Sequence, residues 1–156
     1  MADQTSEVAE RIARFLDANH VMSLATAGSL GPHAASLFYM RDGFGIVWVS
    51  DPNSRHSRDL EADARVSATV APDTSDYALI RGVQIHGTAH RVTDIDERRR
   101  LLALFVQRYS FLARPKDASA KMAAALDSAA VYRLEPLRVV LVDNSLGFGH
   151  KDTLVM

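Results

Sequence analysis

Three apolar runs follow one another within the first fifty residues, and only short turns separate them. The runs cover 21–26, 33–41 and 44–50. The first turn, AGSLGP, holds two glycines and a proline, and the second contains Asp42 and Gly43, the dipeptide most typical of tight hairpins. Strands joined so tightly pair with their neighbours in opposite directions, so this part of the chain predicts an antiparallel meander.

The rest of the chain predicts three further strands and several helices. The strands are 65–71, 79–92 and 130–142, and the helices are one capped by Thr5 or Ser6, one after Asn53, one after Asp94 and one over 117–126. In the 79–92 strand small or apolar residues alternate with polar ones, which predicts one buried face. Pro136 predicts a bulge or an edge position in the last strand.

Some of these strands are apolar on both faces, notably 46–49 and 139–142. A sheet with this pattern is covered on both sides, by helices or by a second copy of the chain. Trp48 therefore lies in the core or in an interface. The sequence predicts one domain over residues 1–156 of the α+β, mainly β class, a six-stranded antiparallel barrel with flanking helices.

Composition excludes several classes of function. The formal net charge of -1 gives no general attraction to nucleic acid or to anionic membranes. Without cysteine, the chain has no disulfide, thiolate nucleophile or cysteine-bound metal. The first 20 residues lack the apolar core of a secretion signal, and no run approaches the roughly 18 apolar residues of a membrane span. We expect a soluble, cytoplasmic protein with neither nucleic-acid nor membrane partners.

Histidine spacing does not indicate a metal site. His86 and His90 lie on one face of the 79–92 strand, about 13 Å apart, which is too far to share an ion. The chain contains neither an HxH nor an HExxH spacing. We therefore expect no metal ion.

Basic and hydroxyl side chains open the helix after Asn53. Ser54, Arg55, His56 and Arg58 stand at its N-terminus, where backbone N–H groups point outward and the helix dipole is positive. Cations are unfavourable there by a few tenths to about 1 kcal/mol each, unless a bound anion, usually phosphate, offsets them. The alternative interpretation is a solvated basic turn, balanced by acidic residues at 59, 61 and 63.

Short motifs follow one another along nearly the whole chain. In order, these are Gly31-Pro32-His33, Ser50 at a strand end, Ser54-Arg55-His56, Ala64-Arg65-Val66 and Ile85-His86-Gly87-Thr88-Ala89. Their order resembles that of the FMN-binding split barrels related to pyridoxamine phosphate oxidase. The segments LIRGVQ and DNSLGFGHK are similar to those of one bacterial branch, the YhbP-type proteins. The resemblance implies a six-stranded antiparallel split β-barrel with flanking helices.

The resemblance also implies a homodimer with FMN at the subunit interface. The ring is expected along the 33–38 strand, and the C-terminal tail, bent at Gly147 and Gly149 with Phe148 packed inside, is expected to cross to the partner subunit. The implied site residues are Ser50, Ser54, Arg55 and His56 for the phosphate, Ser36 and Phe38 for the ring, and Lys151 as a second phosphate contact. The implied activity is an FMN-dependent oxidoreductase with NAD(P)H as a reductant and a small acceptor.

Two departures from the family pattern limit what the resemblance implies. His56 stands where the phosphate turn usually has lysine, and histidine is fully charged only below about pH 6.5 unless phosphate raises its pKa. The longer C-terminal segment with which pyridoxamine phosphate oxidases hold their substrate is missing, so we do not expect that activity. The alternatives are a non-catalytic ligand-binding or interaction protein that has lost FMN, and a relative that binds deazaflavin or haem, with a haem ligand from His86, His90 or His150.

Overall fold

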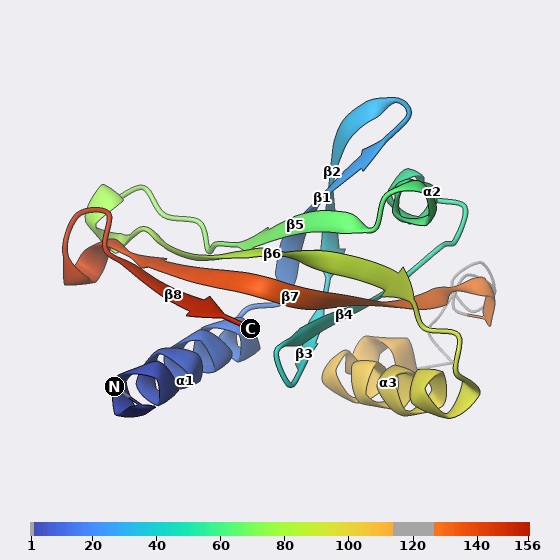
Figure 1. The fold of residues 1–156 in the computed structure, drawn as a ribbon. Helices are drawn as coiled ribbons and strands as arrows, with labels where there is room; N and C mark the ends of the chain where they lie inside the picture. Colours follow the sequence, from blue (N-terminus) through green and yellow to red (C-terminus); the bar gives the residue numbers. More distant parts are fainter. Residues whose placement is uncertain (1, 114–126) are drawn as a thin grey trace.

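In a computed structural model, which describes residues 2–113 and 127–156, one antiparallel sheet of eight strands carries three α-helices around it (Figure 1). The helices are α1 (Ala2–Ala18), α2 (Arg55–Ala62) and α3 (Ile95–Arg108). The strands are β1 (Val21–Gly28), β2 (Gly31–Phe38), β3 (Met40–Asp42), β4 (Gly45–Ser50), β5 (Arg65–Val70), β6 (Arg81–Arg91), β7 (Ala130–Asp143) and β8 (Lys151–Val155). No helix among these residues is long and apolar enough to cross a membrane.

The strand order is β2-β1-β5-β6-β7-β4-β3, and β8 pairs with β7 beside this path. Figure 1 shows the β1–β2 hairpin standing steeply across the long strands β5, β6 and β7, so the sheet is strongly curled. Neighbouring strands in the sheet are antiparallel throughout. The predicted antiparallel barrel with flanking helices is thus confirmed in class.

The structure has eight strands, two more than the six that the sequence predicts. The predicted 33–41 strand breaks at Tyr39, which is fully buried and whose hydroxyl donates to the Leu16 carbonyl at 2.6 Å. This contact anchors Tyr39 to the end of α1, and β3 follows as a short strand of its own. The tail adds β8, in which Lys151 pairs with Val142 of β7.

Three helix predictions have different outcomes. The cap at Thr5 or Ser6 is wrong, because α1 already begins at Ala2. The helix expected over 117–126 lies outside the described residues. The helix after Asp94 is confirmed as α3, since the Asp94 carboxylate accepts a hydrogen bond of 2.8 Å from the backbone N–H of Glu97.

Turn and bulge chemistry agrees with the sequence. Asp42 pairs with Gly45 across the β3–β4 hairpin, and Gly43 has a φ of 63°, which glycine adopts without a steric penalty. The predicted irregularity at Pro136 is confirmed, because the β6–β7 register shifts between His86 and Gly87. Gly87 is required there, since a Cβ at this position would lie 2.1 Å from the carbonyl oxygen of Glu135.

Strand β4 separates two apolar cores. Trp48, with no exposed surface, belongs to the larger core, which also receives Leu16 of α1 and Leu60 of α2. Val47 faces the smaller core, where Phe105 of α3 packs. The prediction that this strand is covered on both faces, with Trp48 buried, is therefore confirmed.

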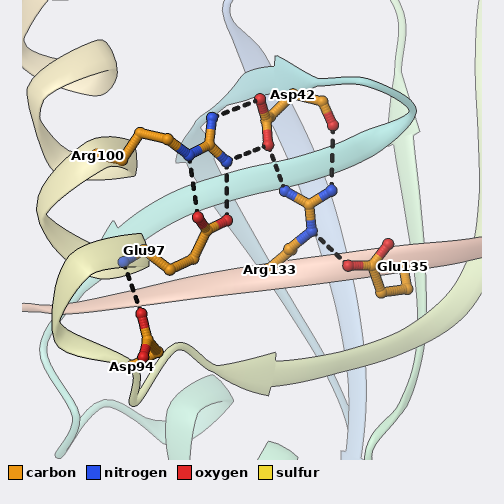
Figure 2. Close-up of polar contacts among 6 residues, drawn as sticks. All are labelled: Asp42, Asp94, Glu97, Arg100, Arg133 and Glu135. Atoms are coloured by element: carbon orange, nitrogen blue, oxygen red, sulfur yellow. Dashed lines mark hydrogen bonds and ion pairs between the residues drawn. The ribbon is translucent and has the colours of Figure 1, made fainter.

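A network of ion pairs holds α3 against the β3–β4 hairpin (Figure 2). The carboxylate of Asp42 accepts hydrogen bonds of 2.8 and 3.1 Å from Arg100 of α3 and of 2.6 Å from Arg133 of β7. Arg100 also pairs with Glu97, and Arg133 with Glu135. These contacts fix the position of the helix from which Phe105 projects toward the candidate site.

Candidate functional site

The turn between β4 and α2 places a serine at each of its ends. Ser50 is the last residue of β4, and Ser54 is the N-cap of α2, whose side chain accepts from the backbone N–H of Ser57 at 3.4 Å. The turn itself is closed by a 3.0 Å hydrogen bond from the Ser54 N–H to the Asp51 carbonyl. The predicted basic helix start is therefore a capped helix N-terminus.

Ser50, Ser54, His56 and Ser57 form one hydrogen-bonded group, here called the His56 cluster. The Nε2 atom of His56 lies 2.6 Å from Ser50 Oγ and 3.1 Å from Ser54 Oγ. Ser54 Oγ also donates to Ser57 Oγ at 2.8 Å. Three of the residues expected to hold a phosphate are thus brought into direct contact, at the N-terminus of a helix.

The environment of His56 disfavours its charged form. The side chain is only 7% exposed, and this burial lowers the pKa of its imidazole, an effect to which the neighbouring His33 adds. The two rings are stacked, with centroids 6.5 Å apart and planes inclined by 6°. The carboxylate of Asp59 opposes this shift only in part, and it also accepts a 2.8 Å hydrogen bond from Thr26. The His56 imidazole is therefore neutral near pH 7 in the free protein.

Arg55 lies at the edge of the His56 cluster. Its Nη2 atom contacts the backbone carbonyls of Leu30 and Gly31 at 3.3 Å, in the β1–β2 turn, and its Nε lies 3.9 Å from Asp59. These contacts join α2 to the hairpin. The guanidinium remains 38% exposed, so it can turn toward an anion at the helix start.

A cavity of about 390 Å³ begins at Ser50 and extends between β2, the end of β4 and α3. Ser36, Phe38 and Ser50, all implied as site residues by the sequence, line it together. The other lining residues among those described are Leu37, Val49, Asp51, Phe105, Phe111, Leu112, Ser128 and Ala129. Most of this wall is apolar, as is usual for small-molecule and cofactor sites.

Aromatic side chains from a distant segment complete the wall, and sequence reasoning missed them as site residues. Phe38 contacts Tyr109 and Phe111, with ring centroids 5.1 and 5.8 Å apart, and Phe105 packs on Tyr109 at 4.8 Å. The Tyr109 hydroxyl donates to the Tyr39 carbonyl beside β2. No local signal in the sequence indicated that Phe105 and these aromatic residues meet β2.

Comparison with known proteins identifies the relatives of this arrangement. The family model of pyridoxamine 5'-phosphate oxidase matches residues 8–143. The chain belongs to this family. A UPF0306 protein from Serratia proteamaculans is 32% identical over 149 residues, which cover 94% of each chain. The expected family, with its YhbP-type branch, is thereby confirmed.

Solved structures of related proteins share the fold. A haem-binding protein from Mycobacterium smegmatis is 26% identical, with a TM-score of 0.73; it matches over 95% of this chain, which spans 57% of its length. The haem storage protein from Vibrio cholerae is 16% identical, with a TM-score of 0.66 over 94% of this chain and 92% of its own. The split barrel expected for the family is confirmed, with eight strands in place of six.

Lys151 lies far from the other residues that the resemblance implied for the FMN site. It pairs with Val142 of β7, whereas Ser50 pairs with Ala130, twelve residues away along the same strand. That separation is roughly 40 Å in an extended strand. Within one chain Lys151 does not reach the His56 cluster, and its role from a partner subunit stays a prediction.

The tail that leads to Lys151 has the expected bend but not the expected packing. Gly147 and Gly149 have φ values of 135° and 72°, which agrees with the predicted tight bend. Phe148 is not packed inside, because it is 87% exposed and rests edge-on against Tyr77 at 6.3 Å. The bend projects this ring outward from the turn that connects β7 to β8.

The histidines considered for metal or haem lie outside the cavity. Within residues 2–113 and 127–156, no group of three His, Asp or Glu side chains is placed to hold a metal ion. His86 contacts Ser67 on the exposed face of β5 and β6, and His150 lies 3.2 Å from Asp152 of β8. Neither they nor His90 belong to the cavity lining described above.

Proposed function

We propose that this protein is an FMN-dependent oxidoreductase that acts as a homodimer, with the flavin phosphate at the His56 cluster and the ring in the adjoining cavity. The observation that carries the proposal is the position of Ser50. This residue contacts His56 and also lines the cavity, so an anion site and an apolar site for a flat ring are continuous.

The His56 cluster suits a phosphate monoester. Hydroxyl groups of Ser50 and Ser54 can turn from the imidazole toward phosphate oxygens, since a hydroxyl proton rotates freely to suit its acceptor. The first turn of α2 adds backbone N–H groups and the positive end of its dipole. Arg55, already beside this turn, supplies a guanidinium that matches phosphate geometry.

The cavity suits the ring. Its wall offers the apolar faces of Phe38 and Val49 for packing and the hydroxyl of Ser36 for the polar ring edge. When bound, the flavin supplies two-electron transfer between NAD(P)H and a small acceptor. The residues of this chain bind and orient the ring and keep water away from it.

The haem alternative has support from a relative but not from the site. The related protein from Mycobacterium smegmatis is named for haem binding. A haem in this cavity needs an axial ligand, and among the described lining residues there is no histidine, tyrosine, cysteine or methionine. The donor set therefore favours a phosphate-bearing flavin, of which deazaflavin is the close variant.

The direct test is a titration of the purified protein with FMN, followed by flavin absorption and by the fluorescence of Trp48. Trp48 is the sole tryptophan of the chain, and it lies two residues before Ser50. We expect saturable binding that the combined Ser54→Ala and Arg55→Ala variant abolishes. Arg14→Gln is the matched control, because Arg14 is an exposed arginine of α1 that pairs with Glu10.

Further outcomes separate the alternatives. Anaerobic loss of visible flavin absorption on addition of NADH or NADPH supports the oxidoreductase. If added FMN gives no saturable change in flavin absorption or in Trp48 fluorescence, the proposal is overturned. That result favours the non-catalytic ligand-binding protein. A protein that ignores FMN but shifts the absorption of added haem favours the haem reading.

A further inference from the structure

We propose that phosphate binds at the His56 cluster together with a proton, which His56 takes up from solvent as the ligand enters. This inference rests on the proposed function and specifies how the same site holds its anion. It makes flavin affinity depend on pH through one named residue, and it distinguishes phosphate-bearing flavins from riboflavin.

The first step of the argument is the placement of Nε2. This atom contacts Ser50 Oγ at 2.6 Å and Ser54 Oγ at 3.1 Å. In the free protein, the two hydroxyl groups that a phosphate would bind are therefore hydrogen-bonded to the imidazole. A phosphate that binds these hydroxyls leaves Nε2 facing negatively charged oxygens. A protonated Nε2 then gains a charge-assisted hydrogen bond, roughly twice as strong as a neutral one.

The second step is the charge around the cluster. Arg55, the nearest cation of α2, makes its described contacts with the β1–β2 turn and Asp59 rather than with Ser50 or Ser54. The strands β1 and β4 carry no ionisable side chain. A phosphate dianion at these hydroxyls therefore meets the imidazole of His56 directly, whereas Arg55 reaches it only by leaving its present contacts, so a charge on His56 adds to what Arg55 supplies.

The third step is the set of groups that act on the His56 proton. The stacked ring of His33, from β2, disfavours the charge, and the carboxylate of Asp59, which also lies 3.9 Å from Arg55, favours it. Beside Ser57, a small cavity is lined by Glu61 of α2 and by His90 and Arg91 of β6. With burial added, this balance keeps the pKa of His56 low in the free protein, and two negative charges of the ligand reverse it.

The expected size follows from linkage. Near pH 7.5 the phosphate is already close to a dianion, because its second pKa is about 6. Full uptake of one proton makes the dissociation constant of FMN rise up to about tenfold for each pH unit above neutrality. Riboflavin, which has the same ring without the phosphate, should bind with little dependence on pH.

The experiment is calorimetric titration of the whole protein with FMN at pH 7.5, in buffers of different ionisation enthalpy. The dependence of the measured heat on the buffer gives the number of protons taken up. The wild-type protein is compared with His56→Lys, which carries a permanent charge, and with His56→Gln, which carries none. His33→Gln is the control for loss of a neighbouring imidazole.

We expect uptake approaching one proton per FMN in the wild type and in His33→Gln, and close to none in His56→Lys and His56→Gln. A wild-type protein that binds FMN without proton uptake overturns the inference, and so does uptake that persists in both His56 variants. If a variant does not fold, the proton uptake measured for the wild-type protein still decides whether the first of these two outcomes holds. Failure of the wild-type protein to bind FMN is a different result, which overturns the proposed function itself.

Discussion

The hydroxyl oxygen of Ser50 lies 2.6 Å from the Nε2 atom of His56, so the last residue of β4 and the first turn of α2 share one short contact. Ser50 is also part of the cavity wall. The contact therefore joins the polar helix start to the apolar space beside β2, and a ligand with an anionic end and a flat ring fits both parts.

We expect Ser50→Ala to raise the dissociation constant of FMN about tenfold, equivalent to ~1.4 kcal/mol, because one phosphate donor is lost. Binding of riboflavin should change much less. Fluorescence titration measures both constants. Ser67→Ala, on the exposed face of β5, is the control and should bind FMN like the wild type; equal affinity in the two variants contradicts the placement of the phosphate.

Stability should decrease in mildly acidic solution because of His56. Its pKa is lowered on folding, mainly by burial, so below the unfolded value near 6.5 the unfolded chain binds more protons than the folded one. The free energy of unfolding, measured with urea, should therefore fall from pH 7.5 to pH 5.5. The fall should be smaller in His56→Gln and unchanged in His86→Gln; identical profiles in all three proteins contradict the assignment.

The ion-pair network at Asp42 should contribute measurable stability. Asp42→Asn leaves the mostly buried guanidinium of Arg133 with Glu135 as its one carboxylate in the network, and we expect a loss of about 1–3 kcal/mol. Hydrogen bonds from Arg100 and Arg133 lower the pKa of Asp42 to about 2, so its contribution is present above about pH 4 and is lost as the pH falls through about 2.

Urea unfolding of the Asp42→Asn variant at pH 6, and again at acidic pH, measures this contribution. The control is Asp96→Asn on the same face of α3, where the Asp96 side chain is 94% exposed and pairs with Arg99 at 3.8 Å. That change should stay within about 0.5 kcal/mol. An equal effect of the two substitutions shows that the network adds nothing beyond surface charge.

Gly87→Ala should damage the β6–β7 pairing. The added Cβ meets the Glu135 carbonyl oxygen at 2.1 Å, which forces the bulge at Pro136 to open, and we expect a loss of about 2–4 kcal/mol. Thermal or urea unfolding measures it. Thr88→Ala, one residue along and exposed, should remain within about 0.5 kcal/mol of the wild type.

Lys151 should contact the FMN phosphate only from the partner subunit of a dimer. We expect Lys151→Ala to weaken FMN binding several-fold without changing the unfolding temperature, since Lys151 is exposed and lies at the far end of β7 from Ser50. Sedimentation of the wild-type protein with FMN should give a dimer. A monomer that binds FMN, or an unchanged affinity in the variant, removes Lys151 from the site.

Much of the fold was readable from the sequence because its signals are local. The hairpin at Asp42 and Gly43, the alternation along β6 and the bulge at Pro136 depend on backbone preferences and on the two-residue period of a strand. The helix start at Ser54 follows from neighbours in the chain. These features appear in the structure where the sequence predicts them.

Tertiary structure decided the rest, because the partners are distant in the chain. Tyr109 bonds the carbonyl of Tyr39, seventy residues away, and this contact brings α3 and its aromatic side chains to the cavity beside β2. The break between β2 and β3 falls at Tyr39, whose hydroxyl partner Leu16 is also distant in the chain. The sequence by itself determined which residues open the helix at Ser54. Only the folded chain decided that Ser50 joins them to a cavity, because strand pairing and helix packing place its walls side by side.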